Sequence, residues 1–332
     1  MKAIVVKRNT VKYVEKKNPV IKGGGDVLLE VLMVGLCGSD VQRIDLILTK
    51  GVGHPTLGHE VVGRVVSVGK KVRRVRVGDV VVVAPLLFCG RCFWCEGGDI
   101  QHCDDLGSVG KTLDGGFAER VIVPVEDNLY KVKKNFNFQE LVLADPLAVC
   151  IHAQGLVGNL TSKKIAIIGD GTIGEIFYRL ALLNDAKEVV VFGRGSIIGK
   201  KADDYFDIVV DCVGRGEKDL INKAICLVRR KGTILVLGAY RSGFVLPVNA
   251  RALFSKEIML VGSNSYGFSG NKKDEFNEAV RLISERKLNL EGIITHKLPL
   301  DKFEFGLGLF RTKKTSGAKK IVFFPGNDFH SK

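Results

Sequence analysis

Four residues from position 37 to position 60 have the side-chain chemistry of a catalytic metal site. Cys37 offers a thiolate, His59 an imidazole and Glu60 a carboxylate, and Asp40 could ligate or orient. These ligand types bind zinc, and a catalytic zinc keeps one position open for substrate. A cysteine and a histidine this far apart are more often a buried thiol and a structural histidine. The assignment therefore depends on the rest of the chain.

A second group of candidate ligands consists of four cysteines within a short, glycine-containing stretch, namely Cys89, Cys92, Cys95 and Cys103. Two-residue gaps let successive sulfurs converge on one ion, and glycines permit the tight turns. Four thiolates close a tetrahedron, which indicates a structural zinc without an open position. An iron–sulfur cluster is the alternative, because related spacings bind clusters.

The chain of 332 residues is long enough for two domains. Its net charge of +14 is consistent with a solvated basic surface or with attraction of anionic small molecules. The densest basic run, at 70–76, alternates with valines and predicts a hairpin with one solvated face. Because the other cations are spread along the chain, we expect no nucleic-acid partner.

The sequence shows no pattern that would direct it into a membrane. The first residues lack a signal-peptide pattern, and the longest apolar runs, around 80–88, are far shorter than the ~20 residues of a membrane span. Eight cysteines in such a chain indicate thiols or metal ligands rather than disulfides. We therefore expect a cytoplasmic protein without a membrane partner.

The pattern of the first 145 residues is that of an antiparallel β domain. Apolar and polar residues alternate at 2–7 and 27–34, and glycines separate further short strands at 61–68, 79–84 and 117–124. Many short strands bounded by glycine favour a barrel-like fold.

A dinucleotide-binding fingerprint follows the apolar strand predicted at 163–169. The sequence G-D-G-T-I-G at 169–174 opens a predicted helix at 176–186, which is the context that G-x-G-x-x-G requires. Glycines let the backbone approach a pyrophosphate, and the helix N-terminus favours its charge. The predicted cofactor-binding residues here are Gly169, Gly171, Thr172, Ile173 and Gly174.

Strands and helices alternate after the fingerprint. Further strands are predicted at 188–192, 206–212, 233–238 and 258–262, with helices at 217–230 and 274–288. This alternation predicts a parallel, doubly wound α/β sheet. The strand at 258–262 would end the sheet, and a two-fold partner could cover its open edge, so we expect a homodimer or homotetramer.

With these motifs in view, the sequence resembles the zinc-dependent medium-chain alcohol dehydrogenases. The shared stretches include V-G-L-C-G-S-D at 34–40, L-G-H-E at 57–60, D-G-G-F-A-E at 114–119 and D-P-L-A-V-C-I-H-A at 145–153. Within the family, the resemblance is to the polyol branch and is strongest to galactitol-1-phosphate and sorbitol dehydrogenases.

The resemblance implies a GroES-like β-barrel catalytic domain at 1–145 and 267–332, with a structural zinc lobe at 86–105. It implies a Rossmann cofactor domain at 146–266 and two zinc ions per chain. The implied reaction transfers a hydride between a secondary alcohol of a polyol or polyol phosphate and NAD or NADP. A catalytically weak relative that binds zinc and ligand but turns over poorly is the alternative.

The same resemblance implies individual roles. Cys37 and His59 would bind the catalytic zinc, Ser39 would pass the alcohol proton towards solvent, and Asp40 would brace the histidine. Asp145 stands where the branch has a glutamate. That glutamate supplies or hydrogen-bonds the remaining zinc position. Because the Asp145 side chain is one methylene shorter than a glutamate side chain, Glu60 can share this role.

Two departures concern the cofactor. NAD-preferring relatives carry an aspartate at the end of the second Rossmann strand, where this chain has Gly193 and Arg194. Loss of the carboxylate and gain of a cation favour NADP. Only residues 196–205 then precede the next strand, where the family places a helix, a strand and another helix. The Rossmann domain is therefore predicted to be shortened after its second strand.

Overall fold

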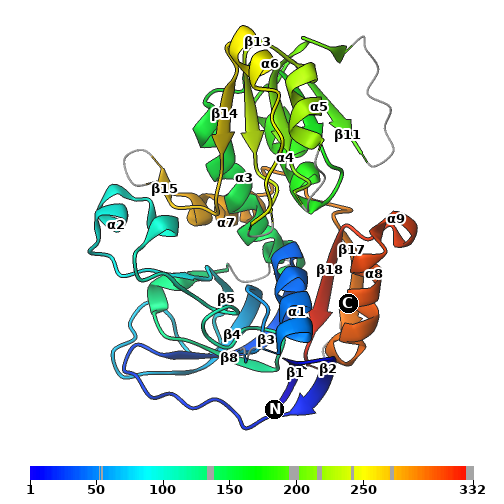
Figure 1. The fold of residues 1–332 in the computed structure, drawn as a ribbon. Coiled ribbons are helices and arrows are strands. Elements are labelled where there is room, and N and C mark those ends of the chain that lie inside the picture. The colour runs from blue at the N-terminus through cyan, green and yellow to red at the C-terminus, as the bar shows by residue number, and fades with distance from the viewer. Residues whose placement is uncertain are drawn as a thin grey trace. The chain divides into compact units, whose positions relative to one another are not determined.

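A computed structural model describes residues 1–51, 53, 55–132, 138–193, 202–214, 219–240, 243–269 and 273–326. The chain forms two compact units, which Figure 1 shows coloured along the sequence. The first unit comprises Met1–Asp145, Lys272–Lys287 and Glu291–Lys332. The second comprises Pro146–Asn271 and Leu288–Leu290.

The first unit is built on a seven-stranded sheet. Its strand order is β17-β18-β3-β4-β5-β9, and β8 also pairs with β3. The strands are β3 (Val27–Leu36), β4 (Glu60–Val68), β5 (Val80–Val83), β8 (Arg120–Val123), β9 (Leu129–Lys131), β17 (Ile294–Pro299) and β18 (Lys320–Phe324). Strands β17 and β18 are parallel, whereas β18 pairs with β3 in the antiparallel sense. Segments from both ends of the chain therefore share one sheet.

Short elements surround this sheet. The strands are β1 (Lys2–Lys7) and β2 (Thr10–Glu15), β6 (Leu86–Leu87) and β7 (Gly107–Ser108), and β16 (Lys273–Asp274). The helices are α1 (Gly38–Lys50), α2 (Phe93–Gly97), α7 (Glu275–Ser284), α8 (Phe303–Arg311) and α9 (Lys313–Ser316), with 3-10 turns at Ile100–His102, Glu126–Asn128, Phe138–Leu143 and Leu300–Lys302. The sequence analysis did not identify α1, which ends at Gly51 in a left-handed conformation with φ of 69°.

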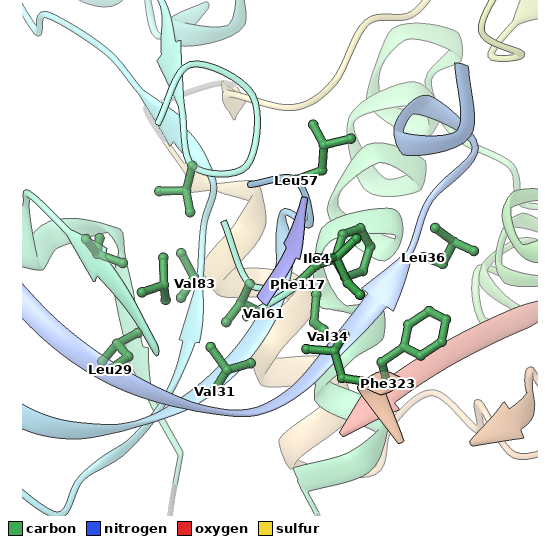
Figure 2. Close-up of a cluster of buried hydrophobic side chains, with 14 of the residues drawn as sticks. Ile4, Leu29, Val31, Val34, Leu36, Leu57, Val61, Val83, Phe117 and Phe323 are labelled. Atoms are coloured by element: carbon green, nitrogen blue, oxygen red, sulfur yellow. The ribbon is translucent and has the colours of Figure 1, made fainter. Parts of the chain in front are cut away.

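The core of the first unit is an aromatic and aliphatic cluster on β1, β3, β4, β5 and β18 (Figure 2). Phe117 lies at its centre, with ring centroids 4.8 Å from Phe303 and 6.0 Å from Phe323. Because Phe303 and Phe323 come from the C-terminal segment, burial of these rings fixes that segment to the N-terminal strands.

The second unit contains a five-stranded parallel sheet in the order β11-β10-β12-β13-β14. Its strands are β10 (Lys164–Ile168), β11 (Glu188–Phe192), β12 (Phe206–Asp211), β13 (Val228–Val236) and β14 (Met259–Gly262). Its helices are α3 (Ala144–Val157, which begins in the first unit), α4 (Thr172–Leu183), α5 (Leu220–Leu227) and α6 (Ala250–Ser255), and a short strand, β15 (Phe268–Ser269), follows.

This strand order confirms the predicted doubly wound α/β fold. The chain moves one way along the sheet from β10 to β11 and the other way from β12 to β13, so right-handed crossovers put α4 and α5 on opposite faces. The order reverses between β10 and β12, which is where such sheets bind ligands. No strand lies between β11 and β12 in the described parts of residues 193–205, so β11 is an edge of the sheet.

Three local expectations were wrong. The run at 70–76 forms turns rather than a hairpin, because Val72 and Val75 are anchored in the core instead of alternating along a strand. The helix expected at 217–230 ends at Leu227, and Val228 begins β13. The helix expected at 274–288 ends at Ser284.

One stretch, Gln139–Val157, is long and apolar enough by length and composition to cross a membrane, with a mean hydropathy of 1.4. The expectation that no apolar run approaches this length was therefore too strict. Half of the stretch is buried inside the protein, and Leu141, Leu147 and Ala153 are fully buried. A helix in the core of a protein can be as long and as apolar as a membrane-spanning helix, and the burial of these residues is that of a core helix.

Substitution in α8 tests the anchoring of the C-terminal segment. Phe303 is 1% exposed and Phe305, two residues along the same helix, is 59% exposed. We expect Phe303→Ala to lower the free energy of unfolding by about 3–5 kcal/mol. The matched control Phe305→Ala should change it by less than ~0.5 kcal/mol. Equal effects in urea unfolding would show that α8 is not part of this core.

Candidate catalytic metal centre and cofactor loop

The candidate catalytic ligands converge at one end of the paired strands β3 and β4. Cys37 follows β3 directly as the N-cap of α1, and Glu60 is the first residue of β4. The antiparallel register pairs Gly35 with Glu60. As a result, ligand atoms of Cys37, His59 and Glu60 all lie within 4.8 Å of one another. Atoms around one zinc ion lie roughly 3–4 Å apart, so this donor set fits zinc after small adjustments.

Gly35 makes room for this arrangement. A Cβ at Gly35 would stand 2.0 Å from Oε2 of Glu60. The Glu60 carboxylate therefore lies directly over the backbone of β3, where any side chain would displace it.

Asp40 orients both neighbouring ligands. Its Oδ1 lies 3.1 Å from Nδ1 of His59, and its Oδ2 accepts the backbone N–H of Cys37 at 3.0 Å. Burial alone would lower the pKa of His59, but the charge and hydrogen bond of Asp40 outweigh it and hold this pKa well above its usual value. With Nδ1 directed to a carboxylate, Nε2 is the histidine nitrogen left for a metal ion.

Ser39 and Asp145 lie at the margins of this group. Ser39 is half-buried in the first turn of α1. Asp145 lies in the first turn of α3, with its Oδ2 3.8 Å from Nε2 of His59. Among the residues that the structure describes, Asp145 is not one of those whose ligand atoms converge within 4.8 Å.

Lys320 is a site residue that the sequence analysis missed. Its Nζ donates to both Oε1 and Oε2 of Glu60, at 2.7 Å each, and both side chains are buried. The pairing of Ile321 with Leu36 sets Lys320 beside the end of β3. The available signal was a lysine at the start of an apolar run, K-I-V-F-F, every residue of which is buried in the structure.

The ion pair sets the charge of the centre. Burial alone would lower the pKa of Lys320, but the Glu60 carboxylate outweighs it and raises that pKa. Lys320 thus keeps a positive charge beside Glu60 and Cys37. A divalent cation bound by Cys37 and Glu60 would be repelled by the Lys320 ammonium. The negative charges of Glu60 and of the Cys37 thiolate would compensate both cations.

The four-cysteine group is local and partly exposed. The sulfurs of Cys89, Cys92, Cys95 and Cys103 all lie within 4.8 Å of one another, and all four thiols are free. Cys92 is the N-cap of α2, and its Sγ is 3.5 Å from that of Cys95. Gly90 turns the chain between the first two cysteines with φ of 72°, a conformation that side chains disfavour.

The surroundings of these sulfurs shift the pKa values of two of the thiols in opposite directions. Backbone N–H groups of Asp104 and Cys95 donate to Cys92 and lower the pKa of its thiol to about 6. Burial raises the pKa of Cys95 to about 12, so that thiol needs a metal ion to lose its proton near neutral pH. Four convergent free sulfurs, one of them readily ionised, fit a tetrahedral metal ion.

The glycine-rich fingerprint joins β10 to α4, as the sequence predicted. Gly169 has φ of 115°, and a Cβ at Gly174 would stand 1.9 Å from the Gly169 carbonyl oxygen. Thr172 and Ile173 form the first turn of α4. Gly193 follows β11, and Arg194 lies outside the described residues. The loop therefore has the close strand-to-helix approach that dinucleotide binding uses.

Replacement of Lys320 tests the buried ion pair. We expect Lys320→Met to lower the free energy of unfolding by about 3–5 kcal/mol, because Glu60 would be left as an uncompensated buried charge. Lys302→Met, at an exposed position, is the matched control. In the double variant Lys320→Met/Glu60→Gln, part of the loss should be recovered. If urea unfolding showed that Lys320→Met leaves the free energy of unfolding unchanged, the predicted role of the ion pair would be contradicted.

Comparison with known proteins agrees with this geometry. Residues 23–134 match the alcohol dehydrogenase GroES-like domain. A zinc-type alcohol dehydrogenase-like protein of Haemophilus influenzae is 31% identical over 85% of this chain and 89% of its own length. D-arabinitol dehydrogenase 1 of Uromyces fabae is 28% identical over 85% and 86% of the respective chains.

Solved structures show the same fold. Galactitol-1-phosphate dehydrogenase of Escherichia coli has a TM-score of 0.86 at 25% identity, over 98% of this chain and 100% of that one. A zinc-binding dehydrogenase of Sinorhizobium meliloti, solved with NADP bound, has a TM-score of 0.81 at 25% identity, over 98% and 99% of the two chains. The chain therefore belongs to the zinc-type alcohol dehydrogenase family, in its medium-chain polyol branch, and is an oxidoreductase with a small-molecule substrate.

Proposed function

We propose that this protein oxidises a secondary alcohol of a polyol or polyol phosphate, with zinc at the Cys37 centre and a nicotinamide dinucleotide on the fingerprint loop. The observation that carries the proposal is the convergence of Cys37, His59 and Glu60, braced by Asp40. The relatives that act on D-arabinitol and galactitol 1-phosphate support the substrate class. The net charge of +14 is compatible with an anionic substrate.

The residues of the centre have distinct tasks in this proposal. Cys37 and His59 hold zinc, which when bound lowers the pKa of an alcohol hydroxyl. Asp40 keeps the His59 ring in the orientation that binds metal. Ser39, half-buried beside Cys37, receives the hydroxyl proton and passes it towards solvent. A nicotinamide dinucleotide held by Gly169, Gly171 and Gly174 would supply the hydride acceptor.

We assign the third protein ligand to Glu60 rather than to Asp145. Glu60 is one of the three converging residues, and a carboxylate has enough lone pairs to bind a metal ion while accepting from Lys320. Asp145, with its Oδ2 3.8 Å from Nε2 of His59, is close enough to act through a water molecule. Zinc retained by Asp145→Asn and lost by Glu60→Ala would support this assignment, and the opposite result would reverse it.

The second candidate function is a relative that binds zinc and ligand but turns over poorly. The observation in its favour is the shortened cofactor unit, in which β11 is an edge strand. Calorimetric titration separates the two candidates, because an active dehydrogenase must bind NAD or NADP at millimolar concentrations or below. The substrate is then identified by absorbance at 340 nm with a panel of polyols and their phosphates.

We also propose that two copies associate through β14. This strand ends the parallel sheet, and its residues Met259 and Leu260 are 59% and 43% exposed. An open, apolar edge can pair with its own copy about a two-fold axis. Light scattering should give a dimer or tetramer at micromolar concentration, and a monomer would contradict the proposal.

Metal analysis tests the division between two zinc sites. We expect two zinc ions per purified chain, and one after either Cys37→Ser or Cys92→Ser. Cys37→Ser should abolish turnover with little loss of stability. Cys92→Ser should lower the unfolding temperature more than the activity of the folded fraction, because its ion is structural.

Cys226→Ser is the matched control, since Cys226 is exposed and belongs to neither group. Iron in place of zinc at the four-cysteine group, or unfolding of both variants alike, would contradict the two roles.

A further inference from the structure

The end of β11 has no carboxylate of its own, but one lies beside it. Strands β10 and β11 are parallel, with Ile168 paired to Phe192, and the Gly169 N–H donates to the Phe192 carbonyl oxygen at 2.9 Å. The next residue on each strand is therefore at the same edge of the sheet. Asp170, the second residue of the fingerprint, is thereby brought next to Gly193.

The Asp170 side chain fills the space that a side chain at residue 193 would occupy. A Cβ built on Gly193 would stand 2.6 Å from Oδ2 of Asp170 and 3.0 Å from its Cγ. Real Cβ atoms do not approach other atoms so closely. Glycine at 193 and aspartate at 170 are thus complementary. A carboxylate is present at the end of β11, but it is attached to residue 170 instead of residue 193.

This carboxylate is available for a ligand. Asp170 is exposed, and within the described part of the chain neither an ion pair nor a hydrogen bond engages its side chain. It lies at the carboxyl end of β10, next to the point where the strand order reverses. Dinucleotides lie across this point in doubly wound sheets.

We propose that Asp170 replaces the ribose-binding carboxylate of the second strand and makes NAD the preferred cofactor. A carboxylate at this place accepts hydrogen bonds from the adenosine ribose hydroxyls and repels a 2′-phosphate. The sequence had favoured NADP because Gly193 left this place empty and Arg194 offered a cation. Asp170 removes the first reason, and Arg194 is outside the described residues. The inference rests on the proposed dinucleotide-dependent function.

Calorimetric titration of the full-length protein with NAD and with NADP tests the inference without relying on turnover. Wild type should bind NAD on the order of tenfold more tightly than NADP, the range of a charge-assisted hydrogen bond. Asp170→Ala should weaken NAD binding roughly tenfold and leave NADP binding unchanged or tighter. Asp301→Asn, an exposed carboxylate of the first unit, controls for net charge.

The swapped variant Asp170→Gly/Gly193→Asp is the decisive arm. Gly193 is not in the left-handed region, so an aspartate there is not strained once the space is vacated. The swap should restore the preference for NAD that Asp170→Ala removes. Circular dichroism of each variant verifies that it is folded.

Two results would overturn the inference while leaving the dehydrogenase function intact. They are a wild type that prefers NADP and an Asp170→Ala variant in which the ratio of the two affinities is unchanged. If that variant bound both cofactors more tightly by the same factor, Asp170 would only repel the pyrophosphate. Failure of wild type to bind either cofactor would instead overturn the proposed function itself.

Discussion

The antiparallel pairing of β3 with β4 is the constraint on which the candidate catalytic centre depends. It places Gly35 opposite Glu60, brings Cys37 beside His59, and leaves the carboxylate lying on bare backbone. Strand β18 then supplies Lys320 to neutralise Glu60 in the interior. A buried charge without this partner would be strongly destabilising, so the sheet and the centre stabilise each other.

The two candidate metal-binding groups differ in how far apart their residues lie along the chain. The four cysteines lie within residues 89–103, and a few tight turns suffice to bring their sulfurs together. The catalytic group instead combines residues from β3, β4 and β18, so it exists only after the sheet has formed. This difference explains why removing one site should act on stability and removing the other on chemistry.

The second unit keeps the parts of a doubly wound sheet that dinucleotide binding uses. Without a further strand beyond β11 in the described chain, the sheet keeps the reversal of strand order between β10 and β12. The glycine-rich loop and α4 are also kept, so the pyrophosphate site does not depend on the strands that are absent there. The role proposed for Asp170, which lies beside Gly193, would compensate for this change on the adenosine side of the site.

The sequence by itself determined the motifs whose residues are close along the chain. These are the four-cysteine group, the fingerprint at 169–174 and the alternating strands and helices, all of which follow from local spacing and periodicity. Only the tertiary structure decided the partners that arrive from distant segments. Lys320 is far along the chain from Glu60, and Asp170 meets Gly193 through strand pairing. Periodicity reports which face of an element is buried, but the contacts across a sheet are set by register, which a single sequence does not reveal.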